Sequence, residues 1–227
     1  MKHIKKSIFF IFLLYIFSPV LHAKDGVWSG VFDINGHGTY DFFALINGTD
    51  ITAYTQKAKV VYKGDIDYSN GFLTTLAMYI KDGTHFSTGV ITASFVKDNS
   101  LSGKWVTYPA EDTGNIFLVN INNQIEKTSE KNINKKWVGF LKKDTSINLS
   151  VVNNKISGKD KNSCTYYGDA NILNDYIYLI EMEIASCGIS DGHYSGMAFI
   201  RKEKNRSVLS INATGENFGI LIKFTEN

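Results

Sequence analysis

Three histidines stand where they could serve as a general base or a metal ligand: His37, His85 and His193. His85 and His193 each follow an Asp-Gly pair closely, and each precedes an aromatic residue and a serine, Ser87 or Ser195. A nucleophilic serine also needs an orienting carboxylate and oxyanion donors, which this spacing does not indicate. His37 has no partner at metal-binding spacing. We therefore predict no catalytic or metal-binding residue, and we interpret the two similar segments as a duplicated hairpin.

The only cysteines, Cys164 and Cys187, lie 23 positions apart, which fits neither a C-x-x-C redox motif nor half of a zinc site. We expect them to form a disulfide, because an exported pair meets an oxidising environment. The competing interpretation is a nucleophilic thiol with a histidine base, which needs a free cysteine. A bridge closing a loop of this size stabilises a fold by about 3 kcal/mol.

Two acidic pairs could suggest glycosidase chemistry: Glu181 with Glu183, and Glu111 with Asp112. That chemistry needs two acids facing each other across a cleft, whereas neighbours on one strand are usually solvated. The Gly-His-Gly stretch at 36–38 lacks the Lys-Ser/Thr of a phosphate loop. We therefore predict no cofactor and no enzyme activity.

Three tryptophans, Trp28, Trp105 and Trp137, could stack on a ligand or fill a core. A tryptophan on the first strand of a small closed barrel packs well inside it. We favour packing, which leaves a small apolar ligand as the less favoured alternative.

Residues 1–23 have a basic start, an apolar run from Ile8 to Phe17 and a short polar exit. This layout is typical of a cleaved bacterial signal peptide. Cleavage after Ala23 would make Lys24 the mature start, with no cysteine there to receive a lipid. We expect a periplasmic or secreted protein with no membrane span after cleavage.

The charge of the chain argues against a nucleic-acid partner. Loss of the three lysines in residues 1–23 would change the formal charge from +2 to −1, and no basic cluster stands in either half. Such a surface offers no electrostatic attraction to a phosphate backbone.

An internal repeat organises the chain. Residues 59–80 match 163–184 at a constant offset of 104, with identities that include Tyr62/Tyr166 and Gly64/Gly168. Upstream, the Trp-x-Gly that begins at Trp28 matches the one at Trp137. We read two homologous domains, at 24–122 and 135–227. The polar stretch 123–134 between them is expected to be a linker.

Alternation with period two runs through both repeats. Its expected inward sets are Tyr176, Tyr178, Ile180, Met182 and Ile184 in one, and Phe72, Thr74, Leu76, Met78 and Ile80 in the other. Glycine-containing turn signals recur at short intervals, as in an antiparallel meander. The predicted fold is all-β: two tandem homologous small antiparallel meander barrels, or curled sandwiches.

The second half carries Gly158-Lys159-Asp160, then Cys164-x-Tyr-x-Gly168, Asn174, Cys187 and Gly192-x-Tyr194-x-Gly196. With the paired Trp-x-Gly openings, this resembles exported bacterial envelope proteins with two tandem lipocalin-like β-domains, often lipoproteins. The resemblance implies a fold and a location but almost no mechanism. This chain departs from the lipid-anchored members because it lacks their lipobox cysteine.

These observations favour a non-enzymatic, exported binding protein that recognises another macromolecule, a protein of the cell envelope or a secreted one. One alternative is a carrier of a small apolar ligand in a barrel interior. Another is a periplasmic inhibitor or immunity protein directed at a toxin or a cell-wall hydrolase.

Overall fold

The computed structural model describes residues 24–142 and 145–227, so the expected signal peptide at 1–23 lies outside the described residues. The strands of the first half are β1 (Gly26–Asp33), β2 (Thr39–Asn47), β3 (Asp50–Thr55), β4 (Val60–Asp67), β5 (Phe72–Ile80), β6 (Gly83–Lys97), β7 (Ser100–Tyr108) and β8 (Thr113–Asn120). Those of the second half are β9 (Lys136–Lys142), β10 (Thr145–Val152), β11 (Lys155–Asp160), β12 (Thr165–Ile172), β13 (Tyr178–Ala185), β14 (Gly192–Glu203), β15 (Arg206–Thr214) and β16 (Phe218–Glu226). The short helices are η2 (Asn122–Gln124), α1 (Glu130–Ile133) and η3 (Gly188–Ser190). The predicted all-β class is confirmed.

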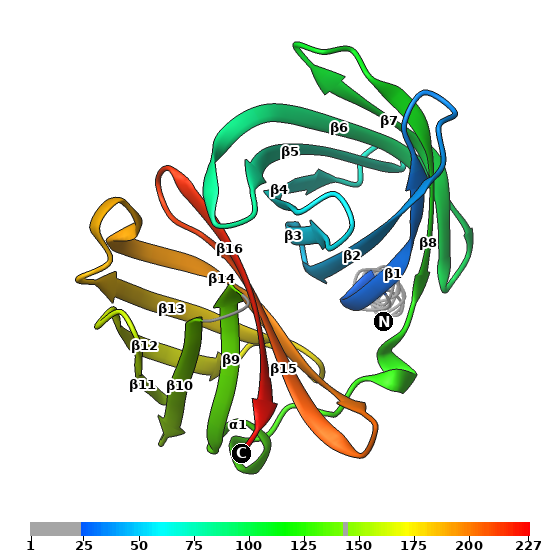
Figure 1. Cartoon of the computed structure of the whole chain (residues 1–227). Coiled ribbons are helices and arrows are strands. Elements are labelled where there is room, and N and C mark those ends of the chain that lie inside the picture. Colours follow the sequence, from blue (N-terminus) through cyan, green and yellow to red (C-terminus); the bar gives the residue numbers. More distant parts are fainter. Residues whose placement is uncertain (1–23, 143–144) are drawn as a thin grey trace, which may run out of the picture.

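Strands β1 to β8 form a closed antiparallel barrel, called the first barrel below (Figure 1). Each strand pairs with the next, and β8 returns to β1 with Trp28 opposite Asn120 and Phe32 opposite Ile116. The alternating inward side chains, such as Phe42 and Leu76, form one buried cluster inside it.

Strands β9 to β16, called the second unit, also pair each with the next in antiparallel fashion. Strand β16 pairs in addition with β9, where Phe224 lies opposite Gly139 and Glu226 opposite Trp137. A second buried cluster, including Trp137 and Phe224, lies among these strands.

The β12–β13 hairpin differs from its counterpart β4–β5 by a shift of two residues. Gly64 lies opposite Leu76, but Gly168 lies opposite Met182 and not opposite Ile180, the residue aligned with Leu76 in the sequence repeat. A side chain at either glycine would meet the neighbouring strand: a Cβ at Gly64 would lie 1.9 Å from a backbone oxygen, and one at Gly168 2.0 Å. The glycines are therefore the true equivalents, and the connection that follows the second one is longer.

The two-residue shift explains why two residues that were expected to face inward do not lie on the inner face of a strand. Most of their members are buried, but Ile80 is 51% exposed and Tyr176 lies before β13 begins. By register Ile80 takes the place of Ser186, beyond the end of β13. A shift of two residues preserves the faces of the strand, so the rest of each set still points inward.

The two His-aromatic-Ser segments of β6 and β14 are not equivalent, which corrects the sequence interpretation. Ser87 lies opposite Met78 and faces the interior, where its hydroxyl donates to the Tyr108 carbonyl at 2.8 Å. Ser195 lies opposite Glu181 on the outer face. The resemblance of the two segments is local, because the strand registers place them differently in the two halves.

The two halves pack side by side through their outer faces. Asn212 on β15 donates from its side chain to the Ala53 carbonyl on β3 at 2.9 Å, with both residues buried. The buried cluster between the halves comprises Val27, Leu45, Tyr54, Val61, Ile121, Ile125, Ile177, Met197, Phe199 and Leu221. Strands in this contact are buried on both faces, which explains why β3 and β15 show almost no exposed positions.

The connection between the halves lies against the second unit. Ile125 and Ile133 are buried, and the Glu126 amide donates to the Ile200 carbonyl at 2.8 Å. The Ser129 hydroxyl caps α1 by accepting from the Asn132 amide. This polar stretch therefore has fixed backbone partners along much of its length.

Candidate functional site

A cavity of about 160 Å³ opens at one end of the second unit. Its floor is apolar and is formed by Tyr166, Ile184, Phe218 and Ile220. Its rim is polar, with the side chains of Asp82, Thr145, Asp160, Asn162 and Ser190. The end of a barrel-like sheet is a common place for a ligand, because the loops there can vary without disturbing the strands.

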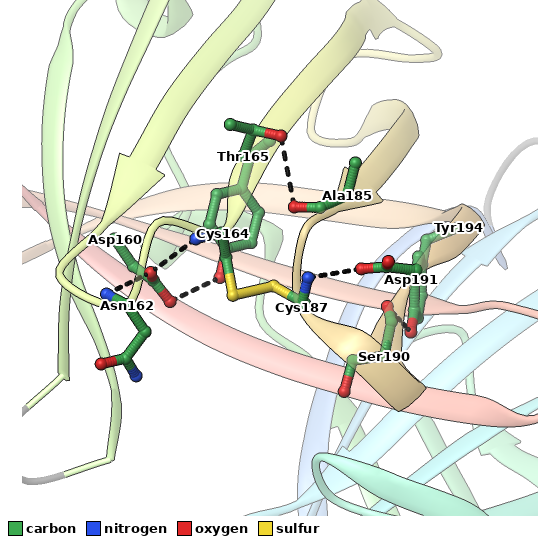
Figure 2. The surroundings of a disulfide bond; sticks show 10 residues. Asp160, Asn162, Cys164, Thr165, Ala185, Cys187, Ser190, Asp191 and Tyr194 are labelled. Carbon is green, nitrogen blue, oxygen red and sulfur yellow. Dashed lines mark hydrogen bonds between the residues drawn. A yellow bond between two sulfur atoms is a disulfide. The ribbon is translucent and has the colours of Figure 1, made fainter.

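The expected disulfide between Cys164 and Cys187 is confirmed, and both cysteines line this cavity (Figure 2). The bridge ties the β11–β12 loop to the turn that follows β13. The residues just before the cysteines, Ser163 and Ser186, both have positive φ, of 68° and 64°. Such left-handed residues turn the chain sharply, so the bridge holds two tight loops at the cavity.

Asp160 organises the β11–β12 loop. One carboxylate oxygen accepts from the Asn162 amide at 2.8 Å and from the Cys164 amide at 3.0 Å (Figure 2). The other accepts from the Tyr166 hydroxyl at 3.3 Å. By register the equivalent residue in the first barrel is Thr55. Its hydroxyl accepts from the Ala58 amide at 2.9 Å. A neutral side chain therefore holds the equivalent loop of the first barrel.

Asp82 reaches the cavity from the first barrel. It lies in the β5–β6 turn, where its amide donates to the Gly219 carbonyl of β16 at 2.8 Å. Next to it, Thr84 pairs with Phe218. In Figure 1 this turn lies beside the start of β16. The site is thus completed by both halves of the chain.

The tyrosine hydroxyls at this end lie in a negative environment. Burial raises the pKa of Tyr166, and the carboxylates of Asp160 and Asp82 raise it further. Burial also raises the pKa of Tyr194, with added effects of Asp191 and Asp82. Both hydroxyls therefore remain protonated near neutral pH and act as hydrogen-bond donors.

The chemistry of the cavity does not fit a metal centre. Asp160, Cys164 and Cys187 place possible ligand atoms within 4.8 Å of one another in the described part of the chain. The two sulfurs are joined in the disulfide, however, and metal binding by cysteine requires thiolates.

Three residues weighed in the sequence analysis meet on the outer face of β13 and β14. Glu181 accepts the Ser195 hydroxyl at 2.8 Å with one oxygen and lies 2.8 Å from His193 Nε2 with the other. The carboxylate thus stands between the serine and the histidine. In a catalytic triad the histidine stands between the other two. Glu183 lies 3.9 Å from the other ring nitrogen of His193. Glu181, Glu183, His193 and Ser195 therefore form a polar cluster on the outer surface of the sheet.

The remaining candidates are scattered. His85 packs edge-on against Tyr79 in the first barrel, and His37 is exposed in the turn after β1. Asp112 accepts from the Asn35 side chain at 2.8 Å, and its neighbour Glu111 is exposed. None of these four lines the cavity in the second unit.

The tryptophans are packed inside the strands. Trp28 is 1% exposed and donates from Nε1 to the Lys24 carbonyl, four residues earlier, at 2.8 Å. Trp137 is fully buried and donates in the same way to the Ile133 carbonyl at 3.0 Å. Trp105 donates to the Asp33 carbonyl at 2.7 Å. Each indole therefore satisfies its polar atom within the protein.

The interior of the first barrel is packed with large buried side chains. A cavity of only about 20 Å³ lies among its core residues, which include Phe32, Tyr62 and Trp105. A shallow groove of about 390 Å³ runs instead over the outside of β6, β7 and β8, lined in part by Val90, Lys104 and Val106.

Sequence reasoning missed Asp82, Asp160 and Tyr166 as members of one site. Asp82 stands in the sequence as part of an Asp-Gly pair, whereas Asp160 and Tyr166 stand in the motifs that carry the family resemblance. Asp160 and Tyr166 meet within the β11–β12 hairpin, but the approach of Asp82 depends on the packing of the two halves, for which the sequence carries no direct signal.

Comparisons with known protein families, with curated proteins and with solved structures found no match to this chain. No helix in the described residues is long and apolar enough to cross a membrane.

Proposed function

We propose that this chain is an exported, non-enzymatic binding protein, built from two barrels of common origin, that recognises another macromolecule of the bacterial envelope or its surroundings. The strand registers support the common origin. Gly30 lies opposite Leu118 where the first barrel closes, and Gly139 lies opposite Phe224 where β9 meets β16. The same Trp-x-Gly element thus stands at both junctions.

The packed core cluster of the first barrel carries the proposal. A space of about 20 Å³ is near the volume of a single water and far below the several hundred Å³ of typical ligand sites. A closed barrel with a packed interior recognises partners by its outer surface. Carriage of a ligand inside the first barrel is therefore disfavoured.

The outer groove on β6, β7 and β8 is the surface that suits a protein partner. Val90 lies opposite Val106, and Lys104 lies between Thr92 and Asn115 on adjacent strands. Beside it, Phe117 and Val31 lie opposite each other and are 46% and 44% exposed. Neighbouring apolar side chains with a polar border are typical of protein interfaces.

Photocrosslinking in the native host tests this proposal. A crosslinker at Thr92 should capture one exported protein, and Val106→Glu should abolish the adduct. A crosslinker at the exposed Lys159 of the second unit serves as the matched control. The absence of a specific adduct at Thr92, or the same adducts at Lys159, would count against the proposal.

The disulfide supports an oxidising compartment for the mature chain. With a cleaved leader, the intact mass should correspond to a chain that begins at Lys24. Retention of residues 1–23, or a lipid adduct, would contradict the proposed export route.

Carriage of a small apolar molecule is a second candidate, favoured by the cavity of about 160 Å³ in the second unit. Native mass spectrometry of protein from its own host distinguishes the two. The bare polypeptide mass is expected for a partner-binding protein, and a stoichiometric lipid would favour the carrier. An inhibitor or immunity role would be a special case of partner binding, recognised by the identity of the crosslinked protein.

A further inference from the structure

We infer that the cavity of the second unit binds a small organic cation, with its apolar body on the floor and its protonated amine beside Asp160. The cavity lies outside the groove proposed for a protein partner, and its occupant differs in kind.

The size and floor of the cavity suit one small ring or a short alkyl chain. Ile184 and Ile220 are 3% and 4% exposed, and they form the floor with the rings of Tyr166 and Phe218. An apolar cavity of about 150 Å³ in another protein holds one benzene molecule. At about 160 Å³, this space has the same capacity.

The charge at the rim selects the sign of the ligand. Two carboxylates line the cavity, and no lysine or arginine does so among the described residues. Asp82 has an ion pair with Lys81 at 3.7 Å. No described lysine, arginine or histidine comes within 4.0 Å of an Asp160 oxygen. An ammonium group at the rim would be attracted and a carboxylate repelled.

The loop that Asp160 caps does not need a negative charge to hold its shape. Thr55 is the equivalent residue in the first barrel and caps its loop with a neutral hydroxyl. All three donors to Asp160 are neutral groups: two backbone amides and the Tyr166 hydroxyl. Among the residues that the structure describes, no charged group pairs with this carboxylate, which lines a cavity that could hold one.

The register also indicates how the second unit comes to have this space. Trp28 pairs with Ala44 on β2, and Trp137 pairs with Leu149 on β10. Tyr40 and Thr145 each stand four residues before that paired residue, so they are equivalent positions. The Tyr40 ring stacks on Phe32 with centroids 5.4 Å apart and packs against the core at that end of the first barrel. Thr145 instead leaves the cavity open at its rim.

Benzylamine is the probe for the test, with benzyl alcohol and benzoate as neutral and anionic analogues. Titration of the mature full chain, followed by NMR, should give saturable shifts at Ile184 and Ile220 with benzylamine. Benzyl alcohol should bind about tenfold more weakly, because it lacks the charge. Benzoate should not bind.

Asp160→Asn should remove the preference for benzylamine while leaving weak binding of benzyl alcohol, because asparagine keeps an acceptor for the loop amides. Asp65→Asn, on an exposed site of β4, is the matched control and should change nothing. Thr145→Tyr, which copies the first barrel, should abolish binding of both probes. Thermal unfolding of each variant checks that it is folded.

Equal affinity for benzylamine and benzyl alcohol, or no saturation by benzylamine up to about 10 mM, would overturn the inference. Equal weakening by Asp65→Asn and Asp160→Asn would also overturn it, since the attraction would then belong to the whole surface.

Discussion

The two halves of the molecule share an antiparallel strand order, with each strand paired to the next, but they end differently. At one end of the first barrel, Tyr40 packs against the core and Thr55 caps a loop. At the equivalent end of the second unit, Thr145 leaves space and Asp160 caps the loop with a charge. The strands of a duplicated scaffold stay fixed because their packing is shared, whereas its ends are free to change. The functional difference between the halves is therefore best sought at these ends.

The interior layers differ as well, although both are packed. In the first barrel Trp105 lies opposite Gly114, and in the second unit Ala213 lies opposite Ile220. The pairing of successive strands makes Trp105 equivalent to Ala213 and Gly114 equivalent to Ile220. The large side chain and the small one are on opposite strands in the two halves, so the total side-chain volume of each pair stays similar. This exchange shows why an equivalent position can tolerate alanine in one half only.

The largest expected effect is that of Trp105→Ala. It should lower the free energy of unfolding by about 3–5 kcal/mol, because Gly114 opposite cannot fill the vacated space. Urea unfolding measures this loss. Phe117→Ala, at a side chain that is 46% exposed, is the control and should cost far less. A loss at Trp105 no greater than the control would mean that the first barrel collapses around the site.

Removal of the disulfide tests what sustains the open end of the second unit. Cys164→Ser with Cys187→Ser should lower the free energy of unfolding by about 3 kcal/mol. Hydrogen exchange should show the loss mainly in β11 to β13, with β1 to β8 affected less. A uniform loss over both halves would instead indicate that they unfold as one unit through the contact between them.

Much of the fold could be predicted from local patterns. Period-two alternation gave the strands, the cysteine spacing and expected export gave the disulfide, and the repeat gave the equivalence of Tyr62 with Tyr166. The register of β13 could not be predicted, because a two-residue change in a hairpin connection preserves the alternation of its faces.

The site could not be predicted, because it needs long-range packing. Residues 51–55 and 207–214 are buried almost without a break, because one face of each strand packs on its own core and the other packs on the other half of the chain. The sequence could indicate that such strands are covered but not by which segment. The meeting of Asp82 with β16, which completes the cavity, follows only from that contact.

Asp160 provides a smaller and sharper test of the comparison. Asp160→Ala removes the acceptor of two backbone amides and one tyrosine hydroxyl, and it should cost about 2 kcal/mol of unfolding free energy. Asp160→Asn should cost about 1 kcal/mol or less, because its oxygen can still accept from the loop. Chemical unfolding of the two variants measures the difference. Equal losses would mean that the charge itself holds the loop, and the parallel with Thr55 would fail.

The smallest effect concerns alkaline stability and compares the equivalent tyrosines. Burial raises the pKa of both Tyr62 and Tyr166, and nearby carboxylates add to each shift: Asp41 for Tyr62, and Asp160 foremost for Tyr166. A raised folded pKa favours the protonated form. The resulting stability is therefore complete below the unfolded pKa of about 10 and is lost as pH rises above it.

Unfolding free energies measured between about pH 8 and 11 should therefore fall less steeply in Tyr166→Phe and Tyr62→Phe than in the parent chain. Asp160→Asn should flatten the profile slightly through Tyr166, because burial remains while the adjacent negative charge is removed. The same substitution lies far from Tyr62 in the ladder and should leave the effect of Tyr62→Phe intact when the two are combined. If Asp160→Asn made the alkaline loss steeper, the carboxylate would be stabilising the ionised tyrosine, and the negative environment assigned to this end of the second unit would be wrong.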